Sequence, residues 1–150
     1  MQQEPNYGRP EEEPRVTRIP QGGGMSARDE QTWSMLSHLS VLVNLITGVG
    51  GPVAALVIWL VYKDRSQRVA FHALQSLWYQ VAWAVILFVG WSITIFLSLF
   101  FIGLLLVPVM LVASLVPFVH QCYAAYKVNQ GVDYRYPIVA NMIDGGRRAT

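Results

Sequence analysis

The segment KDRSQRVAFHALQSLWYQ, from Lys63 to Gln80, decides the fold because it leads a charged loop directly into an apolar run. Three of its first six residues are basic. The apolar run that follows still contains a histidine, two glutamines, a serine and a tyrosine. Polar groups in apolar surroundings need hydrogen-bond partners, so this segment predicts a polar interior within an apolar protein.

Long uncharged segments on either side of this loop indicate an integral membrane protein. No Asp, Glu, Lys or Arg occurs in the 54 residues of 73–126 or in the 32 residues of 31–62. A helix that crosses the hydrocarbon core needs about 20 apolar residues. The longer segment therefore holds two spans with a short connection, and the shorter one holds a single span or a bent element. Charged residues make up only 13% of the chain, against about 25% in soluble domains.

The composition divides the chain into three parts. Residues 1–25 are rich in Pro, Glu and Gly and are predicted to be a disordered tail. This tail is not a signal peptide, because it lacks a basic head followed by an apolar core. Residues 26–143 form the predicted helical membrane domain, and residues 144–150 form a polar C-terminal tail.

The shorter uncharged segment contains a helix break. We expect a helix with Ser26 as its N-cap and Asp29 and Glu30 in its first turn. It stops at a cluster of helix-breaking residues and a second helix runs from there to Tyr62. The cluster comprises Gly48, Gly50, Gly51 and Pro52. Both pieces are short for a span, so the pair either crosses once with a kink or reverses as a re-entrant hairpin.

The basic residues favour the hairpin. All 11 Lys and Arg lie in the N-terminal tail, in the 63–68 loop or after the last span, and none lies near 96–103. The positive-inside rule then places both termini and the loop in the cytoplasm. We therefore expect an all-α protein of the bacterial inner membrane, with a helical hairpin followed by two transmembrane helices. The predicted interfacial anchors are Trp59, Lys63, Arg65, Lys127, Tyr134, Arg135 and Tyr136.

The polar residues after the loop share one side of a helix. Steps of 100° per residue place them within an arc of roughly 140°. This polar stripe comprises His72, Gln75, Ser76, Tyr79 and Gln80, and its candidate partners on other helices are His38, Asn44, His120 and Gln121. The stripe cannot face lipid without a large energetic cost. It forms either a hydrogen-bonded packing interior or a polar pathway or partner-binding groove.

Catalytic and metal sites are not predicted. No nucleophile stands beside a base in a recognisable arrangement. The three histidines are widely spaced and have no Cys neighbour or H-x₃-H pairing, so we expect neither a metal nor a cofactor. The net charge of +2 does not indicate nucleic acid. The expected partners are the lipid bilayer and other membrane proteins or further copies of the chain.

Four short motifs resemble a known family. They are His38-Leu39; Pro52 and Trp59 with Lys63-Asp64; Phe71-His72 with Gln75 and Gln80; and Gly131 with Tyr136-Pro137. In this order they look like the small bacterial membrane proteins of unknown function grouped with the twenty-kilodalton subunit of the chloroplast inner-envelope translocon. The resemblance covers Asp29 to Ile143. It implies an all-helical fold with about four hydrophobic segments, and by analogy a link to protein translocation.

Three functions are compatible with the sequence. The favoured one is a non-enzymatic integral membrane subunit that packs into a larger assembly, such as a translocation machine. The alternative is a small oligomeric permease or channel whose pathway follows the polar stripe. A third is a membrane anchor that presents the N-terminal tail to soluble partners.

Overall fold

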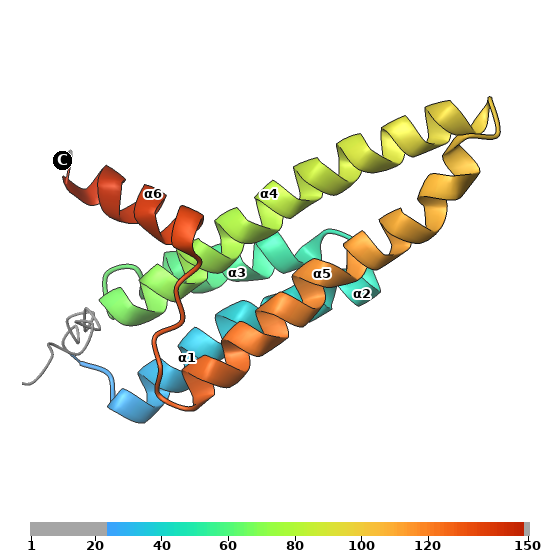
Figure 1. Cartoon of the computed structure of the whole chain (residues 1–150). Helices are drawn as coiled ribbons and strands as arrows, with labels where there is room; N and C mark the ends of the chain where they lie inside the picture. Colours follow the sequence, from blue (N-terminus) through green and yellow to red (C-terminus); the bar gives the residue numbers. More distant parts are fainter. Residues whose placement is uncertain (1–23, 149–150) are drawn as a thin grey trace, which may run out of the picture.

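The computed structural model describes residues 24–148, with side chains up to residue 145, and the predicted disordered tail therefore lies almost entirely outside it. Within this part every regular element is helical, which confirms the predicted all-α class (Figure 1). The elements are α1 (Ala27–Leu39), the 3₁₀ helix η1 (Ser40–Val43), α2 (Asn44–Thr47), α3 (Gly50–Tyr62), α4 (Gln67–Ser98), α5 (Gly103–Asn129) and α6 (Pro137–Arg148).

The first three elements and α3 form a hairpin. As expected, α1 begins at Ser26, whose side-chain oxygen accepts a hydrogen bond from the backbone N–H of Asp29 at 3.1 Å. The chain continues through η1 and α2 and turns at Gly48, where φ is +79°, a conformation that favours glycine. α3 then runs back, so that the rings of Tyr62 and Trp33 lie 4.9 Å apart. The break is a reversal, and the single kinked crossing is excluded.

The helices α4 and α5 have the length and composition of membrane spans. They contain 32 and 27 residues and are joined by a short turn at residues 99–102. Figure 1 shows them as a long two-helix arm that extends well beyond the hairpin. Pro108 and Pro117 both lie inside α5, which membrane helices tolerate when neighbouring groups satisfy the freed carbonyls.

The helix α6 packs beside the start of α4. Its buried residues Ala140 and Ile143 contact Phe71, with Leu74 and Val139 around them. The helix continues past Ile143 to Arg148, so that most of the residues assigned above to a polar tail are helical. The end of the molecule at which α4 begins, here called the wide end, therefore includes α6 as well as the hairpin.

The close approach of α3 and α4 at Gly51 yields a test. A Cβ atom at this position would meet the side-chain oxygen of Gln80 and lie 2.8 Å from the Ser40 carbonyl oxygen. We expect Gly51→Ala to lower the free energy of unfolding by about 1–3 kcal/mol through overpacking, measured by denaturation with SDS in mild detergent. The control is Gly145→Ala, where a Cβ meets nothing within 4 Å. Equal stability of the two variants would contradict this packing.

Candidate functional site: a polar interior that holds the C-terminal loop

The polar stripe of α4 faces the inside of the molecule. His72, Gln75 and Ser76 have no exposed surface, and Gln80 is 4% exposed. α1, α5 and the loop of residues 130–136, here called the C-terminal loop, contribute the groups that face it. The stripe is therefore enclosed by the chain itself.

Gln75 binds the backbone of the C-terminal loop through both ends of its amide. Its Nε2 donates to the carbonyl oxygen of Tyr134 at 2.9 Å, and the N–H of Tyr136 donates to its Oε1 at 3.2 Å. This pair of bonds satisfies a loop that has no secondary structure to satisfy it. One side chain of α4 thus fixes the path of the chain between α5 and α6.

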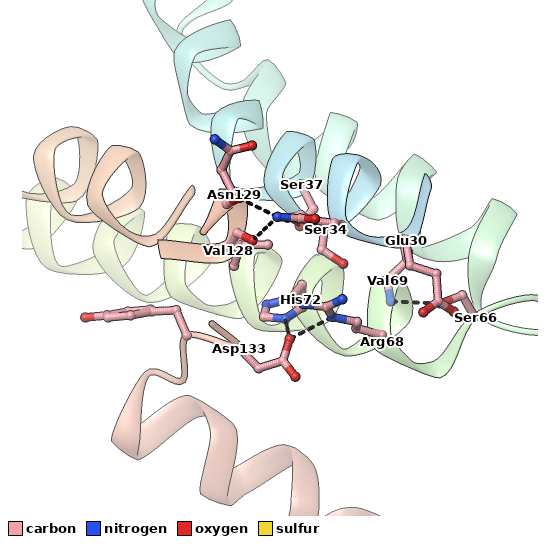
Figure 2. Close-up of polar contacts among 12 residues, drawn as sticks. Glu30, Ser34, Ser37, Ser66, Arg68, Val69, His72, Val128, Asn129 and Asp133 are labelled. Atoms are coloured by element: carbon pink, nitrogen blue, oxygen red, sulfur yellow. Dashed lines mark hydrogen bonds and ion pairs between the residues drawn. The ribbon is translucent and has the colours of Figure 1, made fainter. Parts of the chain in front are cut away.

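Asp133 fixes the same loop by charge. Its Oδ1 accepts hydrogen bonds from Arg68 Nε at 2.7 Å and from His72 Nε2 at 3.3 Å, as Figure 2 shows. Burial alone would raise the pKa of Asp133. The hydrogen bonds from His72 and Arg68 and the positive charge of Arg68 outweigh burial and hold the pKa below its ordinary value. Asp133 is therefore a carboxylate at neutral pH.

This carboxylate orients a chain of two histidines. With Asp133 accepting from His72 Nε2, the Nδ1 of neutral His72 is an acceptor, and it accepts a hydrogen bond from the N–H at His38 Nε2 at 3.2 Å. His38 Nδ1 in turn lies 3.5 Å from the hydroxyl of Tyr136, which donates to it. Burial raises the pKa of Tyr136 far above its ordinary value, which keeps this hydroxyl protonated. The two histidines thus link Asp133 to Tyr136, and both of these residues belong to the C-terminal loop.

The third histidine bridges two tyrosines. His120 Nδ1 lies 2.7 Å from the hydroxyl of Tyr79, and its Nε2 lies 2.7 Å from the hydroxyl of Tyr134. The ring of Tyr136 stacks on Tyr79 with centroids 4.3 Å apart and an interplanar angle of 13°. Hydrogen bonds and ring packing therefore join α4, α5 and the C-terminal loop in one cluster.

Gln80 joins the tip of the hairpin to α4. Its Nε2 donates to Ser40 Oγ at 2.9 Å, and its Oε1 lies 3.4 Å from Asn44 Nδ2. The Oδ1 of Asn44 accepts from the N–H of Gly51 at 2.7 Å, which connects α2 to the start of α3. The tip is thus closed by side chains at the level of Gln80.

The structure encloses the nine predicted stripe and partner residues in two hydrogen-bonded clusters. One cluster joins His72, Gln75, Tyr79, His38 and His120 to the C-terminal loop. The other joins Gln80, Ser76, Asn44 and Gln121, with Ser76 donating to Gln121 Oε1 at 3.0 Å. Arg68 and Asp133 were not among the predicted site residues. Two signals could have found them: Arg68 stands four residues before His72 on the same helix face, and Asp133 is the one acidic residue between 127 and 143.

A further group of hydrogen bonds, which was not predicted, links α1 to the start of α4. Glu30 is 1% exposed, and its Oε1 accepts from Ser66 Oγ at 2.6 Å. Ser66 is the N-cap of α4 and accepts from the N–H of Val69 at 3.2 Å (Figure 2). Gln31 adds hydrogen bonds to the carbonyl oxygens of Val128 and Asn129 in the last turn of α5.

Three of the predicted interfacial anchors are basic residues placed over aromatic rings at the same end of the molecule. Lys63 lies 5.6 Å from the ring of Trp59, Lys127 lies 5.6 Å from that of Tyr123, and Arg135 lies 4.9 Å from that of Phe71. A fourth, Arg65, is exposed.

The two predicted tyrosine anchors occupy different places from those expected. Tyr136 is only 2% exposed and lies in the interior, because its ring fills the space beside Tyr79. Tyr134 is half-buried and bonded to His120. Neither presents its ring to lipid headgroups in the way that an interfacial tyrosine does.

The paired histidines do not form a metal site in this arrangement. His38 and His72 direct ring nitrogens at each other, and the remaining nitrogens point to Tyr136 and Asp133. Among residues 24–145, no group of three or more His, Cys, Asp or Glu side chains lies close enough to hold a metal ion.

Replacing Gln75 tests its hold on the loop. We expect Gln75→Leu to lower the free energy of unfolding by about 1–3 kcal/mol, because it leaves the Tyr134 carbonyl and the Tyr136 N–H without their partner. Hydrogen exchange should rise at residues 130–136. Gln67→Leu makes the same change at an exposed site on the same helix and serves as the control. Unchanged exchange in Gln75→Leu would show that the loop is held by other contacts.

The bonds that Asp133 makes to Arg68 and His72 predict that the C-terminal loop is held less firmly at acid pH. Its pKa is lowered in the folded protein, so its stabilising contribution is complete above the unfolded value of about 3.9 and is lost as the pH falls through the lowered folded value. Loop protection, measured by hydrogen exchange over a pH series, should therefore drop at acid pH in the wild type. Asp133→Asn should lack this step. The histidines are common to both proteins, so identical profiles would contradict the role of the carboxylate.

Comparison with known proteins corrects the family assignment. No curated protein and no solved structure matches the chain. The profile of one family matches residues 29–143. The resemblance to the translocon subunit covered the same segment. That resemblance is wrong, because the matching family is a different one. The expectation of protein translocation rested on it alone and has no other support.

Membership of this family, whose proteins belong to a membrane, agrees with the two long apolar helices α4 and α5. The matched segment includes the hairpin, both long helices and the C-terminal loop with most of α6. It covers 115 of 150 residues, counted from 29 to 143 inclusive. The chain is a bacterial membrane protein and belongs to the MamF/MmsF family, the magnetosome magnetite crystal formation protein family.

Proposed function

We propose that this chain is a non-enzymatic structural subunit of a bacterial membrane. The observation that carries the proposal is the occupation of the polar stripe by the chain's own C-terminal loop. Gln75, His72 and Arg68 all bond to residues of this loop. Apart from the Nε2 of Gln121, the polar groups predicted to face a partner or a substrate are hydrogen-bonded within the fold, so that the chain meets its surroundings through its apolar exterior.

The outer face of α3 is the part of this exterior that we propose for contact with other membrane proteins or further copies of the chain. Val53, Val57 and Leu60 are 59%, 52% and 50% exposed. Their spacing of four and three residues aligns them on one side of the helix. Helix packing in membranes depends on van der Waals contact between such faces, and Ala54 beside them permits a close approach.

The family description supports a more specific setting. The family is described by magnetite crystal formation in magnetosomes. For this chain we propose that its part in such a process is to organise the membrane, which is a role that an apolar helical protein can fill. We place it in the inner membrane with both termini in the cytoplasm. The exposed basic residues Lys63 and Arg65, together with Lys127 at the same end, support this orientation.

The channel remains the alternative, and the geometry favours it less. A pathway along His72, Gln75 and Gln80 requires these side chains to face an open lumen. In this chain they are buried and bonded to the loop and to the hairpin tip. Flux of ions through liposomes that contain the pure protein would favour the channel.

The test of the proposal is the composition of the assembly. The tagged chain, extracted from its native membrane in mild detergent, should migrate with other membrane proteins in fixed ratio or as a homo-oligomer. Truncating the α3 face with Val53→Ala, Val57→Ala and Leu60→Ala should reduce this association by about tenfold. The matched control truncates Phe88, Ile95 and Leu105, which are 75%, 65% and 78% exposed on the distant arm. A lone monomer that conducts ions would overturn the proposal.

A further inference from the structure

The hairpin accompanies α4 over about two thirds of its length. Its residues Ser40 and Asn44 are bonded to Gln80, and Gly48 and Val49 at its turn line a crevice together with Leu87, which is the twenty-first of the 32 residues of α4. The remaining 11 residues, 88–98, rise about 17 Å at 1.5 Å per residue. This is close to half of the roughly 30 Å thickness of the hydrocarbon core, and therefore to one leaflet of it. One end of the bundle is thus several helices wide, and the other consists of α4 and α5 alone (Figure 1).

The narrow arm is apolar on its outer surfaces. Phe88 and Ile95 of α4 and Leu105 and Val112 of α5 are all at least 65% exposed. Its turn, residues 99–102, reads Leu-Phe-Phe-Ile and carries no charge. Such surfaces are stable in lipid and not in water, so lipid fills the space beside the arm that the hairpin leaves open.

The wide end has the features of a headgroup layer. The helix α6 lies against Phe71 in the first turns of α4 and adds width there. Every Lys and Arg within residues 24–148 belongs to elements or loops at this end, and three of them lie over aromatic rings. Basic residues near a membrane surface are attracted to anionic lipids. The wide end is therefore anchored in one leaflet.

The junction between the two ends is hollowed. A crevice of about 210 Å³ opens between the hairpin tip and the start of the arm. Its lining includes Val49, Pro52, Trp83 and Pro117, and it is mainly apolar. The width of the protein therefore changes abruptly at this level, where an acyl chain of the opposite leaflet can end.

From this shape we infer that the protein is a one-leaflet wedge that recognises curved bilayers. It occupies more area in the leaflet that holds the basic end than in the other. Curving the bilayer so that this leaflet is convex expands it and relieves the mismatch. The partner is a strongly curved membrane that contains anionic lipid, with the hairpin and α6 in the convex leaflet. This function goes beyond the proposed subunit role, which requires no curvature.

Orientation in vesicles of different size tests the wedge. The full chain, with a fluorophore on an added C-terminal tag, is reconstituted in phosphatidylcholine with phosphatidylglycerol, into small sonicated and large extruded vesicles. A quencher that does not cross membranes reports the ratio of C-termini outside to inside. This ratio should be higher in the small vesicles by about threefold, because their outer leaflet is strongly convex. Equal ratios in the two sizes would overturn the inference.

Two variants separate shape from charge. Ile143→Asp introduces a charge into the buried contact of α6 with Phe71 and should detach α6, which narrows the wide end and lowers the ratio in small vesicles. Asn141→Asp adds the same charge at an exposed site of the same helix and should leave the ratio unchanged. An Ile143→Asp ratio equal to that of Asn141→Asp would remove α6 from the wedge. If Ile143→Asp does not fold, the comparison of vesicle sizes with the wild type decides alone.

Cross-linking in the same vesicles tests the lipid on the arm. Links between copies through residues 85–96 would show that a second copy fills the space beside the arm, and would overturn the wedge. No link there agrees with lipid contact. The assay uses the pure chain alone, so its failure leaves the proposed association through α3 untouched, and loss of that association leaves the wedge untouched.

Discussion

The cost of leaving polar groups unpaired in apolar surroundings is the constraint on which this structure depends. An unsatisfied amide in hydrocarbon costs several kcal/mol, whereas a hydrogen bond between membrane helices stabilises by only about 0.6 kcal/mol on average. The stripe of α4 therefore contributes little stability of its own but excludes every arrangement that leaves Gln75 or Gln80 unpaired. The arrangement that satisfies both uses the C-terminal loop for one and the hairpin tip for the other.

The position of these partners sets the shape of the molecule. Because Gln80 binds Ser40 and Asn44 of the hairpin, the hairpin ends about two thirds of the way along α4 rather than at its far end. Because Gln75 and His72 bind the C-terminal loop, α6 is delivered to the first turns of α4. Both consequences add width at the basic end of the bundle. The polar interior and the uneven cross-section thus both result from the hydrogen bonds of the polar stripe.

The family assignment shows where short motifs are informative and where they are not. The motif residues include His38, His72 and Gln75, and each of them lies in the polar interior. Small membrane proteins of different families need such groups for the same reason, so that similar motifs arise without a shared function. A profile over residues 29–143 separates families that these few positions cannot.

The sequence by itself determined the all-α membrane class, the helix break at Gly48 to Pro52 and the set of polar residues that must be enclosed; that the break is a reversal was decided by the tertiary structure. The three features determined by the sequence follow from local properties: uncharged length, glycine and proline, and a helical period that gathers polar residues on one face. Only the tertiary structure decided what encloses them. Arg68 was assigned to the basic loop and Tyr136 to the interfacial anchors, and Asp133 was not among the predicted site residues. In the fold Asp133 bonds to Arg68 and His72, and Tyr136 bonds to His38. Such pairings join residues 61 to 98 positions apart, and no local pattern encodes which distant group will satisfy a buried one.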